Sequence, residues 1–159
     1  MDAIPQEKLE RVLELYKPEC RYLKEAKIEL LKAEGMFEVN STYYANNFSV
    51  SHLTSVEMNL CLNQLAYVAF AEWIDAGEFE NINLDFEEYF VLIKENMYIV
   101  ESSIKFKEPI ATSKPFKAAM QLRQQKQKGN VHFVFLDYSF EDGKAKGRVG
   151  FALTLDDSP

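Results

Sequence analysis

The sequence predicts an α+β domain in which a curved antiparallel sheet wraps around one long buried helix. Two observations carry this prediction. Residues 54–76 are almost wholly apolar and have the start and stop signals of a helix, and strand-like segments joined by turns lie on both sides of it. A sheet of this size buries one face only by curling around another element, and the long helix is the candidate that the sequence offers.

The segment 54–76 begins and ends with recognisable helix signals. Thr54 followed three residues later by Glu57 is a capping-box pattern, in which each side chain binds the backbone amide of the other residue. Gly77 suits the position just past a helix end, where the backbone often takes a positive φ. Because the residues between them are apolar nearly all round, we expect a helix that is buried on most sides.

The other elements are predicted from periodicity and turn residues. Residues 5–16 place apolar side chains at helical spacing behind Pro5, which predicts a short N-terminal amphipathic helix. Strands are predicted over 21–33 and 35–39, and a short helix over 85–95. The later strands are predicted over 97–106, 116–126, 131–140 and 144–155, with turns at 129–130 and 141–143. This order is that of the hot-dog fold, and the length of 159 residues suits a single domain over 1–159.

The composition argues against several kinds of partner. The formal net charge is −7 and the one basic run, 123–128, is mixed with glutamine, so we expect no nucleic acid partner. Polar side chains interrupt the apolar stretch at Asn59, Asn63, Gln64 and Glu72, which predicts no membrane span. The first ten residues lack the basic and apolar regions of a secretion signal, and we expect a cytoplasmic protein.

Familiar motifs for cofactors, metals and nucleophiles are missing from the sequence. It has no GxSxG elbow, HExxH helix motif, glycine-rich phosphate loop or CxxC pair. The two histidines, His52 and His132, are too few for a histidine-rich metal site, and Cys20 and Cys61 provide no disulfide framework. We therefore expect neither a cofactor nor a metal ion.

Three polar residues of the predicted helix share one face. Asn59, Asn63 and Tyr67 recur at a spacing of four residues, so they form a single stripe along the helix. A buried amide without a hydrogen-bond partner costs about 1–3 kcal/mol, so these groups must be bonded to something. One interpretation is structural, with the stripe facing solvent or neighbouring backbone. The other is functional, with the stripe forming a polar wall against which the thioester of a substrate lies.

Glu57 also allows two interpretations. It is either a capping carboxylate or a general base beside an aromatic pocket. The helix N-terminus offers unpaired N–H groups and a positive dipole end, which suit a carbonyl oxygen that becomes negative during a reaction. His52 and Thr54 lie at that end and are candidate substrate-binding residues.

Several segments resemble the FcoT-like family, which are long-chain acyl thioesterases of the hot-dog superfamily. The resemblance rests on RVLELY (11–16), CRYL (20–23), His52 with VE (56–57), LCLNQLAYVAFA (60–71) and SSIKFKEP (102–109). It implies a dimer with active sites between subunits, in which tyrosines and asparagines replace a serine nucleophile. Carried over to this sequence, these are Tyr16, Tyr44, Asn63 and Tyr67. The chain departs from the family pattern at Thr54, where an asparagine is expected, and over 44–52, which is longer.

The resemblance also implies two reactions. Some members hydrolyse acyl-coenzyme A, and others add glycine to the β-carbon of an α,β-unsaturated acyl thioester on a carrier protein. Glycine addition requires a base for the ammonium group, for which Glu57 is the candidate, and a cation for the carboxylate, for which Lys105, Lys107 and Arg21 are candidates.

We predict glycine addition, because a carboxylate lies near a tyrosine and asparagine pocket and no nucleophile is evident. The substrate would be a thioester of acyl carrier protein or of coenzyme A. The alternatives are thioester hydrolysis, dehydration of a 3-hydroxyacyl thioester by His52 with Glu57, and a non-catalytic acyl-binding module.

Overall fold

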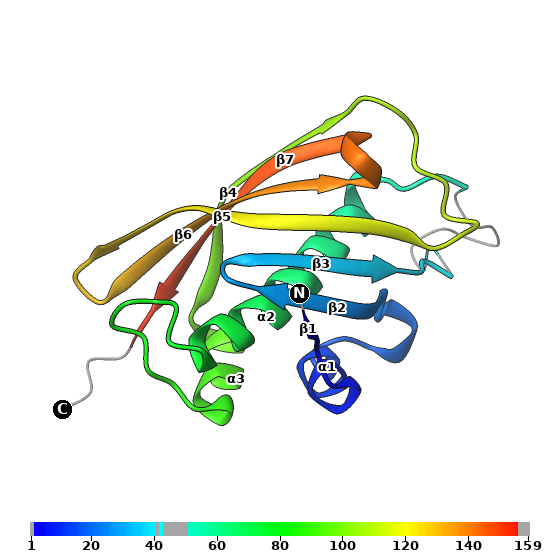
Figure 1. Ribbon diagram of the computed structural model, residues 1–159. Coiled ribbons are helices and arrows are strands. Elements are labelled where there is room, and N and C mark those ends of the chain that lie inside the picture. The colour runs from blue at the N-terminus through cyan, green and yellow to red at the C-terminus, as the bar shows by residue number, and fades with distance from the viewer. Residues whose placement is uncertain (1, 41, 43–50, 156–159) are drawn as a thin grey trace.

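The computed structural model describes residues 2–40, 42 and 51–155. Within them, a seven-stranded antiparallel sheet has the strand order β1-β2-β3-β5-β6-β7-β4 and curves around a central helix, α2 (Figure 1). The strands are β1 (Asp2–Ala3), β2 (Leu23–Glu29), β3 (Lys32–Phe37), β4 (Met97–Phe106), β5 (Phe116–Lys128), β6 (Val131–Phe140) and β7 (Ala145–Thr154). The helices are α1 (Gln6–Leu13), α2 (Ser55–Asp75) and α3 (Phe86–Glu95), with single 3-10 turns η1 (Pro18–Cys20) and η2 (Glu141–Gly143).

The α+β hot-dog arrangement predicted from the sequence is confirmed. Helix α2 begins one residue after Thr54, which caps it, and ends at Asp75, with Gly77 following at φ 70°. The predicted short helices correspond to α1 and α3, and the predicted strands after 96 match β4 to β7 within two residues at each end. In addition to the prediction, the structure shows the two-residue strand β1 and the turns η1 and η2.

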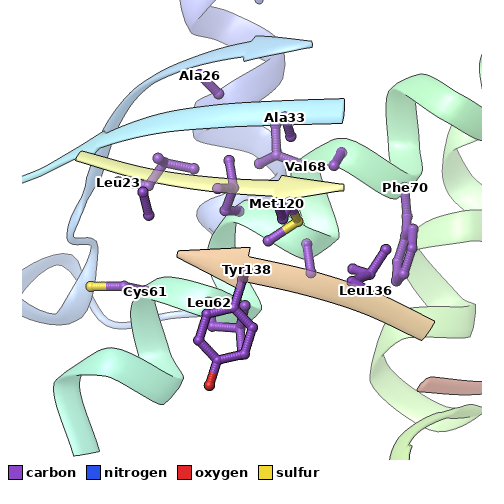
Figure 2. Close-up of a cluster of buried hydrophobic side chains, with 14 of the residues drawn as sticks. Leu23, Ala26, Ala33, Cys61, Leu62, Val68, Phe70, Met120, Leu136 and Tyr138 are labelled. Atoms are coloured by element: carbon purple, nitrogen blue, oxygen red, sulfur yellow. The ribbon is translucent and has the colours of Figure 1, made fainter. Parts of the chain in front are cut away.

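The core lies between α2 and the concave face of the sheet. Figure 2 shows Leu62, Val68 and Phe70 of α2 together with side chains from β2, β3, β5 and β6. The ring of Phe70 packs edge-on against Phe151 of β7, with the ring centroids 5.3 Å apart. Truncating a buried aromatic side chain of this size to alanine typically costs about 3–5 kcal/mol.

The predicted boundary between the first two strands of 21–33 and 35–39 is wrong. The turn lies at Leu30 and Leu31, and Gly35 is inside β3. Leu31 takes a positive φ of 56°, and its N–H donates to the Glu78 carboxylate across 2.9 Å. Glycine at position 35 is explained by packing and not by a turn, because a Cβ there would come within 2.8 Å of the side chains of Leu23 and Phe37.

Strand β4 forms one edge of the sheet and pairs with β7. Four of its apolar residues are exposed, with exposed fractions of 53% for Tyr98, 44% for Ile99, 50% for Val100 and 41% for Phe106. Tyr138 of β6 also binds this strand, because its hydroxyl donates to the Ser103 carbonyl across 2.9 Å. This bond passes Gly147 of β7, where a Cβ would lie 1.9 Å from the Ser103 oxygen. No helix in the described part of the chain is long and apolar enough to cross a membrane.

Candidate active site

The N-terminus of α2 carries the predicted capping box. The Thr54 N–H donates to Glu57 Oε2 across 3.1 Å, and the Val56 N–H donates to Thr54 Oγ1 across 3.2 Å. The Thr54 hydroxyl donates to the same Glu57 oxygen. One oxygen of the Glu57 carboxylate is therefore occupied by the helix cap.

The second oxygen of Glu57 has a different environment. Glu57 has no exposed surface, and among the described residues Oε1 has no hydrogen-bond partner. The Cys61 thiol is one helical turn away, and its pKa is raised by burial and also by the charge of Glu57. Because a buried carboxylate oxygen normally has a partner, this oxygen is suited to accept a proton or a hydrogen bond from a bound substrate.

The polar stripe of α2 divides into two parts. The Asn59 amide donates to the Ser55 carbonyl of its own helix across 2.8 Å, which agrees with the structural interpretation for this residue. Asn63 and Tyr67 are half-buried, and within the described structure Asn63 Oδ1 is buried without a hydrogen-bond partner. Val56, on the same face of the helix, is 44% exposed. This face of α2 is the one that the single subunit leaves partly uncovered.

Three tyrosines gather around the middle of α2. Burial raises the pKa of Tyr16, with smaller contributions from Tyr67 and Cys61. Burial also raises the pKa of Tyr67 and that of Tyr89, and the neighbouring phenols Tyr67 and Tyr16 contribute at Tyr89. At neutral pH all three hydroxyls keep their protons and are hydrogen-bond donors. The Tyr89 hydroxyl of α3 donates to the Tyr67 carbonyl.

Gln64 is a residue whose role sequence analysis missed. It is fully buried, and its Oε1 accepts from the N–H groups of Tyr22 (2.9 Å) and Leu23 (3.0 Å). Its Nε2 donates to the Cys20 carbonyl across 2.7 Å. The signal was present, because a glutamine inside an apolar helix needs partners, but only the fold identifies them.

Gln64 thereby joins two of the segments on which the family resemblance rests. It binds residues 20–23 from its place in the 60–71 segment. Arg21, between Cys20 and Tyr22, donates from Nε to the Tyr16 carbonyl across 3.0 Å. The backbone position of Tyr16 therefore depends on Gln64 through this short chain of bonds.

The other predicted site residues lie elsewhere or are not described. Tyr44 lies outside the described residues. His52 is exposed and forms an isolated bridge with Ala111. Lys105 is exposed on β4 opposite Lys146, on the convex face of the sheet, so the structure does not bring its side chain to the stripe of α2.

No group of three or more His, Cys, Asp or Glu residues in the described part could hold a metal ion. His132 lies within β6 with its side chain buried, and burial lowers its pKa.

The sequence model described as the FcoT-like thioesterase domain matches residues 11–153. The chain belongs to the FcoT-like thioesterase family. This agrees with the resemblance seen in the segments around residues 11–23 and 60–71.

Named relatives of this family member come from two bacterial groups. A (2E)-enoyl-ACP glycyltransferase of Mycobacterium marinum is 37% identical over 127 residues, covering 76% of this chain and 67% of the relative. The Mycobacterium tuberculosis protein of the same name is 33% identical, covering 70% and 63%. The chain thus spans about two thirds of the length of these mycobacterial relatives. A Streptomyces coeruleorubidus protein, also of that name, is 29% identical over 158 residues, covering 92% and 93%.

Solved structures similar to this chain show the fold. A mutant thioesterase from Pseudomonas aeruginosa superposes with a TM-score of 0.56 at 12% identity, covering 95% of this chain and 94% of the other. Zebra fish thioesterase superfamily member 2 also gives 0.56 at 12% identity, covering 93% and 94%. These likenesses confirm the hot-dog fold and carry no conclusion about the substrate.

Proposed function

We propose that this protein adds glycine to the β-carbon of an α,β-unsaturated acyl thioester carried by an acyl carrier protein. The observation that carries the proposal is the buried Glu57 carboxylate, which keeps one oxygen without a partner at the N-terminus of α2. The relatives named glycyltransferases, at 29–37% identity, support it.

In the proposed reaction the carboxylate of Glu57 takes a proton from the ammonium group of glycine. The freed amine attacks the β-carbon, so a C–N bond forms and the electrons of the C=C bond move toward the thioester oxygen as an enolate. The proton held by Glu57 then passes to the α-carbon, and the C–S bond stays intact. The balance is the addition of one N–H across one C=C, with no redox partner.

The enolate oxygen needs hydrogen-bond donors that keep their protons. The hydroxyls of Tyr16 and Tyr67 are protonated at neutral pH, and burial raises their pKa further. The half-buried Asn63 offers an amide N–H one helical turn from Tyr67. Donors placed where negative charge develops are worth about 2.7–4 kcal/mol each in related sites. The N-terminus of α2 adds the positive end of the helix dipole.

The proposal includes a homodimer, with the site completed by the second subunit. The exposed apolar side chains of edge strand β4 and the partly uncovered face of α2 support it, because exposed apolar surface of this kind marks association sites. Light scattering at micromolar concentration should report a dimer. A monomer there would argue against a site between subunits. Carrier-bound acyl thioesters are intermediates of the cytoplasm, and the proposal places the protein there.

Hydrolysis of the thioester is the second candidate, favoured by the family description and by the thioesterase folds that superpose on the chain. Incubation with a medium-chain enoyl thioester, with and without glycine, separates the two reactions by intact mass. A thioester heavier by one glycine supports addition. Free acid released at the same rate without glycine would replace the proposal by hydrolysis.

A further inference from the structure

The end of β4 and the start of β7 concentrate the basic residues of this chain. Residues 103–107 and 144–148, here called the basic ribbon, hold no acidic residue and five basic ones: Lys105, Lys107, Lys144, Lys146 and Arg148. The whole chain has 18 basic and 25 acidic residues, so the remainder carries 13 basic and 25 acidic side chains. The ribbon is a local positive surface on a negative protein.

The lysines of the basic ribbon lie close together, and Glu108, Glu141 and Asp142 flank its two segments in the sequence. Lys105 is directly opposite Lys146 in the antiparallel pair, and the Lys107 N–H donates to the Lys144 carbonyl across 2.7 Å. Arg148 pairs with Asp137 at 3.3 Å, whereas the four lysines have no ion pair within the described residues. Like charges directly opposite each other destabilise a sheet, so the fold itself gains nothing from this arrangement.

The basic ribbon lies at the same end of the sheet as the candidate active site. The Leu53 N–H, just before the cap of α2, donates across 2.8 Å to the carbonyl of Ile110, which follows β4. Figure 1 shows α2 beginning beneath the end of the sheet where β4 finishes and β7 starts. A partner docked on the ribbon would therefore stand near the helix end that holds Glu57.

We propose that the basic ribbon docks the acidic surface of the acyl carrier protein that delivers the acyl thioester. This inference rests on the proposed function and names where its macromolecular substrate binds. Lys105 and Lys146 are exposed on two neighbouring strands, about 5 Å apart across the strands, and Lys107 and Lys144 lie just beyond the ends of the same strands. Such a spread suits charge complementarity with a protein surface, which raises association rate and selects the partner.

The test compares two double substitutions on the same sheet. Lys144→Gln/Lys146→Gln removes two charges from the basic ribbon, and Lys27→Gln/Lys32→Gln removes two exposed lysine charges from β2 and β3 as the matched control. The Kd for a medium-chain enoyl acyl carrier protein is measured by calorimetry, and turnover with glycine is measured on the carrier and on the pantetheine thioester. We expect the ribbon variant to weaken carrier binding about tenfold and the control about twofold or less.

Further measurements distinguish a loss of carrier docking from misfolding and from a loss of catalysis. The ribbon variant should melt like the parent, keep its turnover of the pantetheine thioester, and show a weaker salt dependence of carrier binding. Lys144→Arg/Lys146→Arg, which keeps the charge, should bind the carrier like the parent. Unchanged carrier affinity, equal losses in both double variants, or an equal loss of turnover on the pantetheine thioester would overturn the docking proposal. If the unsubstituted protein binds the carrier but forms no glycine adduct, the proposed function is refuted. The docking proposal is still tested in that case by the carrier affinities of the variants.

Discussion

The side-chain amide of Gln64 donates to the Cys20 carbonyl across 2.7 Å, joining the middle of α2 to the segment just before β2. The same side chain accepts from two backbone N–H groups, so its oxygen and one N–H are satisfied by chain that is more than 40 residues away. Because Tyr16 is bound to Arg21 within this segment, Gln64 is a positioning residue for the tyrosine cluster.

Replacing Gln64 with leucine should therefore lower the stability of the protein. Gln64→Leu removes the hydrogen bonds of Gln64 to two backbone N–H groups and one carbonyl, which should lower the free energy of unfolding by about 2–5 kcal/mol. Urea unfolding followed by the fluorescence of the single tryptophan, Trp73, measures this change. Gln125→Leu, at an exposed position of β5, is the control and should change it little. A Gln64→Leu protein as stable as the parent would show that the bonds are not formed in solution.

A substitution at Glu57 distinguishes a catalytic role from a capping role, because the two roles predict losses in different quantities. Losing a cap costs about 0.5–2 kcal/mol of stability, whereas losing a general base costs about 10²–10⁴ in rate. Glu57→Gln keeps a side chain that fits the capping box but takes no proton. We expect it to melt near the parent temperature, bind acyl thioester and turn over at least about a hundredfold more slowly. If most of the activity persists, the base is assigned to Tyr44 or His52 instead.

Asn63 should matter for turnover far more than for folding. Its Oδ1 has no partner within the described chain, so Asn63→Leu removes no protein hydrogen bond from that atom. We expect turnover to be abolished while the free energy of unfolding changes by about 1 kcal/mol or less. Asn83→Leu, at an exposed loop position, is the comparison and should keep full activity. Full activity of Asn63→Leu would assign the stripe a structural role.

Gly147 should tolerate no side chain. A Cβ there would overlap the Ser103 carbonyl oxygen and the Tyr138 hydroxyl, so β4 would have to move away from β7. Gly147→Ala should destabilise the fold by about 1–3 kcal/mol and weaken any dimer built on the β4 edge. Tyr138→Phe, which removes only the hydroxyl, should cost about 1 kcal/mol. Thermal melting and light scattering measure both effects, and a Gly147→Ala protein that matches the parent in both would refute this account of the edge strand.

Alkaline pH should destabilise the protein in a defined window. Burial raises the pKa of Tyr138 from 10.0 to about 12. The folded protein therefore holds this proton more tightly than the unfolded chain does. The stability gained at Tyr138 is fully present below pH 10 and is lost as the pH rises toward about 12. Tyr138→Phe should show a shallower loss in urea unfolding across that window, and an equal slope in both proteins would contradict the assignment.

Local sequence patterns determined most of the element boundaries. The helix 54–76 was predicted within one residue of α2, because a capping box and a terminal glycine act within one or two turns of the chain. The strands 97–106 and 131–140 coincide with β4 and β6, because alternation and turn residues are also local signals. The stripe of Asn59, Asn63 and Tyr67 followed from helical periodicity alone.

Long-range contacts decided the rest. The turn at Leu31 contains no residue that favours a positive φ, and Glu78, 47 residues further on, holds its backbone amide. Gln64 and Tyr89 became site residues only when the fold brought Cys20 and Tyr67 to them. The two oxygens of Glu57 differ for the same reason, since a capping pattern predicts one bonded oxygen and only the packing around α2 leaves the other buried without a partner.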